Sequence, residues 1–166
     1  MHPAALDDEA LLKDCEVASG RASGPGGQNR NKVETAIRIT HRPSGLVAKA
    51  TERRHKEQNK QQALLRLRLK LAAQVREPVD PAAAASACWQ ARVRQRKLMI
   101  NPGHADYPSL LAEALDRLAA VGYEVPAAAE LLGVSASQLL KLIKHEPDAM
   151  SRLNSQRRSA GLHPLK

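Results

Sequence analysis

The residues whose types and spacing best suit a chemical reaction are two glycines and a glutamine, Gly26-Gly27-Gln28, inside the glycine-rich stretch 20–32. Adjacent glycines allow backbone angles that other residues rarely adopt, and they let the main chain approach a reacting centre closely. A glutamine side chain is neither a base nor a nucleophile at neutral pH, but it can orient a water molecule. A backbone N–H beside it can stabilise a developing oxyanion. These groups suit the hydrolysis of an ester that is already activated.

Two other uses of a glycine-rich loop do not fit this sequence. A phosphate-binding P-loop needs Gly-Lys-Ser/Thr leading into a helix, whereas Gln28 is followed by a segment with strand-like alternation. A dinucleotide fingerprint needs a strand before the loop and a helix after it, and that order is missing. The basic residues that flank the motif, Arg21, Arg30 and Lys32, are candidates for contact with RNA phosphates.

Positive charge is concentrated around this loop. The 166-residue chain has a formal net charge of +9. Residues 21–76 contain 14 Lys and Arg against 3 Asp and Glu, whereas residues 101–166 contain 7 of each kind. Such a surface attracts phosphate backbones by releasing condensed counterions, although a merely solvated basic face is the alternative. The candidate RNA-contacting residues beyond the loop are Arg53, Arg54, Lys56, Lys60, Arg66, Arg68 and Lys70.

Composition excludes several other classes of protein. Aromatic residues are only 2% of the chain and Phe is absent, which argues against a single-stranded RNA reader built on base stacking. Two scattered cysteines do not make a disulfide framework, and the six histidines show no metal-ligand spacing. His41 and His55 are expected to be exposed. No signal peptide or membrane span is recognisable. We therefore expect a cytoplasmic protein with no cofactor and no metal.

The segments beside the loop predict a small antiparallel sheet. Residues 15–19 are expected to form a brief strand. Residues 33–40 alternate apolar and polar positions, as a half-buried strand does. The turn residues 42–45 and a second alternating run, 46–51, complete a hairpin. A short helix is expected before the first strand, over residues 4–14.

Residues 52–75 carry conflicting patterns. The run 64–71 alternates as a strand would, but no β-branched residue occurs from Arg53 to Gln74. Ala, Leu, Gln, Lys and Arg, which favour helices, dominate the segment. The leucines at 64, 67 and 71 also fall on one helical face. We therefore predict a long basic helix.

The last third of the sequence predicts helices. A linker at 77–81 is expected to precede a helix over 82–98 in which Trp89 packs inward, and Asn101-Pro102-Gly103 ends that helix. Four more helices are predicted, over 107–121, 126–132, 135–145 and 147–159. Residues 125–144 are typical of a helix-turn-helix. Its turn, cap and shared core are predicted to consist of Gly133, Ser135, Leu131, Val134, Leu139 and Leu142.

The predicted fold class is α+β, a short β-sheet with a hairpin and a long basic helix followed by an all-helical domain with a trihelical core. The predicted division is a catalytic domain at 1–76, a linker with a basic helix at 77–103, and a helical docking domain at 104–166.

Residues 21–40, RASGPGGQNRNKVETAIRIT, resemble the catalytic-domain signature of the class I peptide chain release factors. The positions that match are Arg21, Ser23, Gly24, Gly26, Gly27, Gln28, Asn31, Lys32 and Ala36. Residues 40–67 resemble that family's hairpin and helix and contain the expected Asn59-Lys60, although residues 54–56 depart from the usual pattern. The chain starts about 20 residues before the loop, so it is most similar to the small rescue hydrolases of the family.

The resemblance implies catalytic roles for Gly26, Gly27 and Gln28. Gln28 would place the attacking water beside the terminal adenosine of peptidyl-tRNA, and its main-chain N–H would stabilise the transition state. The implied partners are large-subunit ribosomal RNA and peptidyl-tRNA. The C-terminal domain is expected to bind a ribosomal protein or delivery factor. The protein is expected to be a monomer and to have no membrane partner.

Two classes of function remain open at this stage. One is a codon-independent peptidyl-tRNA hydrolase that rescues stalled ribosomes. The other is a nucleic-acid-binding regulator that uses the helix-turn-helix and has no hydrolase activity. The first accounts for the loop, the uneven charge and the lack of cofactor motifs, whereas the second accounts only for the last third of the chain.

Overall fold

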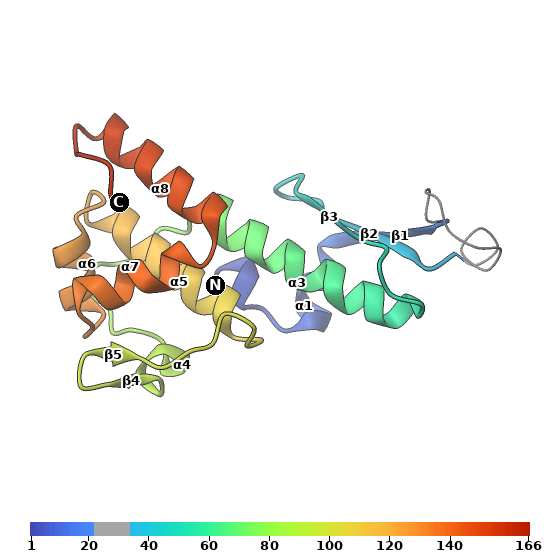
Figure 1. The fold of residues 1–166 in the computed structure, drawn as a ribbon, viewed down its shortest axis with the longest axis horizontal. Coiled ribbons are helices and arrows are strands. Elements are labelled where there is room, and N and C mark those ends of the chain that lie inside the picture. Colours follow the sequence, from blue (N-terminus) through green and yellow to red (C-terminus); the bar gives the residue numbers. More distant parts are fainter. Residues whose placement is uncertain (22–33) are drawn as a thin grey trace. The chain divides into compact units, whose positions relative to one another are not determined.

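The computed structural model describes residues 1–21 and 34–166 (Figure 1). These residues form two compact units. We call Leu6–Lys70 the sheet unit, and Met1–Ala5 together with Leu71–Lys166 the helical unit. One unit carries a β-sheet and the other is mainly helical, so the predicted α+β class is confirmed.

The sheet unit is built on three antiparallel strands in the order β1-β2-β3. These strands are β1 (Cys15–Gly20), β2 (Ala36–His41) and β3 (Val47–Ala50), and the helix α1 (Asp8–Lys13) precedes them. Asp7 caps α1 by accepting a hydrogen bond from the Ala10 N–H at 2.8 Å. The three predicted strands are confirmed with shifted ends, whereas the helix predicted over 4–14 is shorter and covers only Asp8–Lys13.

The conflict over residues 52–75 is resolved in favour of the helix α3 (Lys56–Gln74). Within the sheet unit, Leu64 and Leu67 of α3 are buried, as are Ile37 and Ile39 of β2. Burial of this leucine stripe, in a segment without β-branched residues, favours the helix over the alternating pattern.

The helical unit has the helix α5 (Tyr107–Ala120) at its centre, and ten of its fourteen residues are buried. Around it lie α6 (Val125–Leu131), α7 (Ala136–Lys144) and α8 (Pro147–Ser159), as Figure 1 shows. The 3-10 helix η1 (Pro3–Ala5) also contacts α5. The four predicted C-terminal helices are therefore confirmed within a residue or two.

The helix predicted over 82–98 is wrong. The structure has a four-residue helix, α4 (Ala87–Gln90), and then a hairpin of β4 (Val93–Arg94) and β5 (Lys97–Leu98). The indole of Trp89 is fully buried and donates a hydrogen bond to the Leu132 carbonyl at 2.8 Å. This tertiary contact confirms the predicted packing of Trp89 and fixes a local path that helix propensity does not anticipate.

The structure also divides the chain differently from the predicted boundaries at 76 and 103. Two buried residues of α5 hold the predicted linker, because Asp116 accepts hydrogen bonds from Arg76 and from the Glu77 N–H. Arg117 donates to the carbonyls of residues 80, 81 and 83. Residues 71–103 therefore belong to the same compact unit as 104–166.

The helix-turn-helix prediction is largely confirmed. Gly133 adopts a φ of +66°, and Ser135 caps α7 by accepting a hydrogen bond from the Gln138 N–H at 3.3 Å. Val134, Leu139 and Leu142 are buried. The prediction for Leu131 is wrong, because its side chain is 41% exposed and the next residue, Leu132, is buried instead.

A buried histidine in the helical unit predicts a pH-dependent stability. His2 accepts a hydrogen bond from the Ala4 N–H and bonds the Val75 carbonyl, and burial lowers its pKa to about 4. The unfolded chain therefore takes up this proton at higher pH, near its ordinary pKa of about 6.5. The stability is fully present above that pH and is lost as the pH falls toward 4.

Protonation of His2 in the unfolded chain should lower the unfolding free energy of the wild type by about 2 kcal/mol between pH 7.5 and pH 5. His2→Gln, which keeps an amide donor but does not titrate, should lack this loss. Urea unfolding of both proteins at the two pH values measures this difference. Burial raises the pKa of Asp116 to about 6, which changes stability with pH in the opposite direction. Because both proteins contain Asp116, this effect cancels in the comparison. Equal pH dependence of the two proteins would refute the assignment.

Candidate active site

The predicted catalytic residues Gly26, Gly27 and Gln28, and the basic residues Arg30 and Lys32, lie outside the described residues. The structure does describe how the chain is held on either side of them. In the β1–β2 ladder, Gly20 pairs with Ala36, so residues on either side of the segment 22–33 lie on neighbouring strands. Arg21, the last described residue before that segment, is exposed. The sheet therefore fixes the positions of the chain just before and shortly after the motif.

A buried asparagine joins Thr35, the residue before β2, to the start of α3. The Asn59 side chain is fully buried, and its Nδ2 donates to the Thr35 carbonyl at 2.6 Å and to the Arg53 carbonyl at 3.0 Å. Its Oδ1 accepts a hydrogen bond from the Arg53 N–H at 2.9 Å. One amide thus satisfies three backbone groups and joins the residue before β2 to the turn before α3.

Removing this amide should be costly. Asn59→Ala leaves buried backbone groups without partners, so we expect the unfolding free energy to fall by about 2–4 kcal/mol. Gln58→Ala, at the exposed neighbouring position of α3, should change it by less than about 0.5 kcal/mol. Urea unfolding monitored by circular dichroism measures both changes. If the two variants were equally stable, Asn59 would not be the anchor that the geometry indicates.

Some of the predicted RNA-contacting residues of α3 and the turn before it are available to solvent. Arg53, Arg54 and Lys56 are exposed, and Lys60 is half-buried. No ion pair joins any of these four side chains to an acid within residues 1–21 and 34–166. Four cations close together in sequence, free of carboxylates, are the arrangement that contacts with phosphates require.

The other three predicted residues make contacts within the sheet unit. Arg66 pairs with Glu52 at 2.6 Å and also donates to the Lys49 carbonyl at 2.7 Å. Arg68 pairs with Asp8 at 2.8 Å, and its side chain is only 12% exposed. These contacts join α3 to β3 and to the start of α1.

Lys70 likewise donates to the Val47 carbonyl of β3 at 2.6 Å. The pKa of the Glu52 carboxyl is lowered, first by hydrogen bonds from backbone N–H groups, including that of Thr51, and then by Arg66. Arg66, Arg68 and Lys70 therefore stabilise the sheet unit through contacts within it, whatever further contacts they make with RNA. Lys70 is itself exposed, so its bond to Val47, and not burial, distinguishes it from Arg53, Arg54, Lys56 and Lys60.

The prediction that His41 is exposed is wrong. His41 is the last residue of β2, opposite Cys15 in the ladder, and only 4% of it is exposed. Its Nδ1 lies 2.7 Å from the Ser44 hydroxyl, within the turn that leads to β3. Burial lowers the pKa of His41. His55, in contrast, is exposed as predicted.

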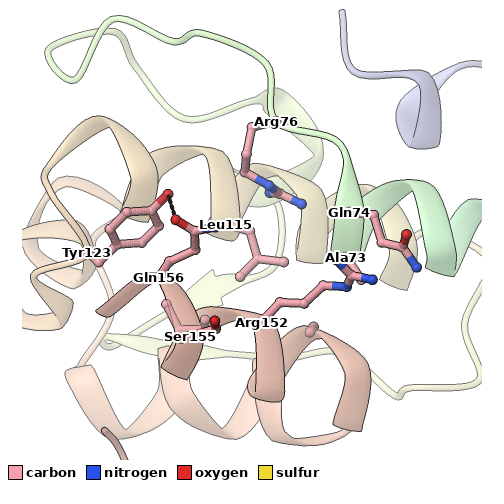
Figure 2. Close-up of a pocket in the computed structure, with 10 residues that line it drawn as sticks. Ala73, Gln74, Arg76, Leu115, Tyr123, Arg152, Ser155 and Gln156 are labelled. Carbon is pink, nitrogen blue, oxygen red and sulfur yellow. Dashed lines mark hydrogen bonds between the residues drawn. The ribbon is translucent and has the colours of Figure 1, made fainter. Parts of the chain in front are cut away.

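The helical unit contains a polar cavity of about 150 Å³, formed by side chains from the end of α3, from α5 and α8, and from the turn after α5 (Figure 2). Its two guanidinium groups both have carboxylate partners, Arg76 with Asp116 at 3.0 Å and Arg152 with Asp148 at 3.0 Å. Because these charges are already compensated, we do not assign the cavity a role in catalysis.

Residues 1–21 and 34–166 contain no group of three His, Cys, Asp or Glu side chains placed to hold a metal ion. They also contain no helix long and apolar enough to cross a membrane.

The segment that contains Gly26-Gly27-Gln28 joins two paired strands, and exposed cations lie at the start of α3 and just before it. These features define the class of the site. The RF-1 domain family model matches residues 9–101. This match covers more than half of the chain, so the chain belongs to the RF-1 domain family.

Individual relatives agree with the family match. The chloroplastic peptide chain release factor PrfB1 of Arabidopsis thaliana is 49% identical over 67 residues, which are 40% of this chain and 15% of that protein. Peptide chain release factor 1 of Parafrankia sp. is 40% identical over 91 residues, 55% of this chain and 26% of that protein. Peptide chain release factor 2 of Haemophilus ducreyi is 47% identical over 66 residues, 40% of this chain and 18% of that protein. This chain therefore spans about a quarter or less of the length of these relatives.

Proposed function

We propose that this protein hydrolyses the ester between peptide and tRNA in the ribosomal peptidyl-transferase centre, and that it does so without reading a stop codon. The observation that carries the proposal is the Gly26-Gly27-Gln28 motif, which falls inside the RF-1 domain match at 9–101. The relatives described above are named as peptide chain release factors. No comparison supports the alternative of a helix-turn-helix regulator without hydrolase activity.

The chemistry assigned to the motif needs no ionisable side chain. The Gln28 amide orients a water molecule for attack on the ester carbonyl, and the Gln28 N–H stabilises the negative charge that develops on the carbonyl oxygen. Gly26 and Gly27 let the main chain come close to the ester. The water oxygen bonds to the carbonyl carbon as the bond to the ribose oxygen breaks, a water proton passes to that oxygen so that the tRNA leaves with a ribose hydroxyl, and the peptide is released with a free carboxyl group.

Binding to the ribosome is assigned to the exposed cations. Arg21, Arg53, Arg54, Lys56 and Lys60 are available in the described structure, and Arg30 and Lys32 flank the motif in the sequence. Contacts of these side chains with large-subunit RNA would position the loop, because phosphate contacts fix register and orientation. We further propose that the protein acts as a monomer in the cytoplasm, with a ribosomal protein or delivery factor as a possible additional partner of the helical unit.

Release of a labelled peptide from three purified complexes tests this proposal. The complexes are ribosomes stalled at the end of a message with no codon in the A site, ribosomes with a stop codon there, and large subunits carrying peptidyl-tRNA. We expect release from the first complex, and no acceleration when a stop codon is present. Release that depends on a stop codon would contradict the proposed codon-independent rescue but would still support the proposed ester hydrolysis. Comparing the first and third complexes identifies whether the intact ribosome or the large subunit is the target.

A further inference from the structure

The β4–β5 hairpin presents two cations directly opposite each other. Arg94 pairs with Lys97 across the two strands, and both residues are exposed. Like charges at directly opposite positions destabilise an antiparallel pair. No ion pair joins either residue to an acid in the described part of the chain. The stability of the hairpin therefore does not explain this pair, and an external anion would relieve its repulsion.

The turn of the hairpin is held in a conformation that non-glycine residues rarely adopt. Gln95 and Arg96 have φ values of 49° and 61°. Arg96 is fixed by three contacts with the helix-turn-helix: its carbonyl accepts from the Ser135 N–H at 3.0 Å, and its guanidinium bonds Glu130 at 2.9 Å and the Val134 carbonyl at 3.1 Å. The turn is thus attached to the loop between α6 and α7, which fixes where the Arg94–Lys97 pair lies.

Helix α7, which contacts β5 of this hairpin, carries two more cations. Lys141 and Lys144 are exposed, and their side chains have no recorded acidic partner among the residues described. Lys141 lines a small depression together with Leu98 of β5 and with Ile100. The hairpin and α7 therefore meet at this depression, and Lys144 lies about one turn after Lys141 on α7, so the two contacting elements carry one group of exposed cations. We call its four cations, Arg94, Lys97, Lys141 and Lys144, the hairpin–α7 surface.

We propose that the hairpin–α7 surface binds the phosphate backbone of double-stranded RNA. Four uncompensated cations on two joined elements match a row of phosphates. Recognition of single strands by stacking is disfavoured, because the chain has one Trp and two Tyr, and of these Trp89 and Tyr107 are buried. The choice of RNA over DNA rests on the proposed action at the ribosome, whereas the phosphate contacts rest on the geometry alone.

Binding of a labelled RNA duplex of about 20 base pairs to the full-length protein tests this proposal, since a duplex of that length offers more than one groove to such a surface. The test variant replaces all four cations of the hairpin–α7 surface with glutamine. The control is Arg158→Gln/Lys166→Gln, compared with Lys141→Gln/Lys144→Gln, because both pairs are exposed and remove the same charge. Thermal unfolding should occur at no lower temperature in any variant, because the replaced side chains are exposed and removal of Arg94 and Lys97 relieves their repulsion.

We expect the fourfold variant to bind the duplex at least about tenfold more weakly, and the slope of log affinity against log salt to become shallower by about 3. The Lys141/Lys144 variant should lose more affinity than the control. Equal losses in these two variants, an unchanged slope in the fourfold variant, or tighter binding of a DNA duplex of the same sequence would overturn the proposal. The proposal would also be overturned if the fourfold variant bound RNA normally but no longer bound a ribosomal protein that the wild type binds. No peptidyl-tRNA is present, so failure of the proposed hydrolysis would not affect this result.

Discussion

Gly27→Ala is expected to lower the rate of peptide release on saturated ribosomes by about 10²-fold or more, with little change in ribosome affinity. The reason is that an added Cβ restricts the backbone beside Gln28, whose N–H and side chain are assigned to the reacting centre. Loss of one oxyanion donor in other enzymes lowers the rate by about 10²–10³-fold. Single-turnover release measured at several protein concentrations separates the maximal rate from the affinity.

Gly20→Ala provides the matched control for this variant. Gly20 ends β1, a Cβ built there meets no atom within 4 Å, and its φ lies outside the left-handed region. The same substitution near the same loop should therefore leave release close to wild type. Undiminished release by Gly27→Ala, or an equal loss in Gly20→Ala, would contradict the catalytic assignment of the motif.

Ribosome affinity is expected to fall by about 10³-fold between 50 and 200 mM salt, because about six phosphate contacts would release their counterions. The exposed cations Arg53, Arg54 and Lys56 should supply part of this effect. Replacing all three with glutamine should make the slope of log affinity against log salt shallower by about 2 to 3. Sedimentation binding at four salt concentrations measures both slopes.

Lys70→Gln distinguishes contact with RNA from a contact within the protein. Its ammonium donates to the Val47 carbonyl, so this substitution should lower the unfolding free energy while changing the salt slope less than removal of one exposed cation does. A flat salt profile for the wild type would show that the basic face is merely solvated. A larger slope change for Lys70→Gln than for Arg54→Gln would show that the division into exposed and structural cations is wrong.

Periodicity in the sequence predicts the parts of the fold that depend on one buried stripe. The leucines of α3 are spaced for a single helical face, and Leu64 and Leu67 are buried as that spacing requires. The same reasoning gives the helices α5 to α8 within a residue or two, because each has an apolar face or a recognisable cap. Ser135 is an example, since it both precedes an apolar run and caps α7.

Contacts between residues far apart in sequence account for what the sequence does not predict. Residues 93–98 follow a segment with helical composition, but the attachment of Arg96 to Glu130, Val134 and Ser135 holds them as a hairpin. Because the sequence predicts a helix in this region, it gives no indication that a hairpin with exposed cations contacts α7. The sequence singles out Asn59 only through the family resemblance of Asn59-Lys60, and its structural role follows from its bonds to Thr35 and Arg53.

Incorporation of water oxygen into the released peptide tests the central claim most directly. Ribosomes carrying a labelled peptidyl-tRNA are mixed with the protein in ¹⁸O-enriched water, and the released peptide is analysed by mass spectrometry. Hydrolysis of the ester predicts a free peptide acid with one oxygen from the solvent, formed when both the protein and the ribosome are present. Peptide that stays on the tRNA, or release at the same rate without the protein, would contradict the claim.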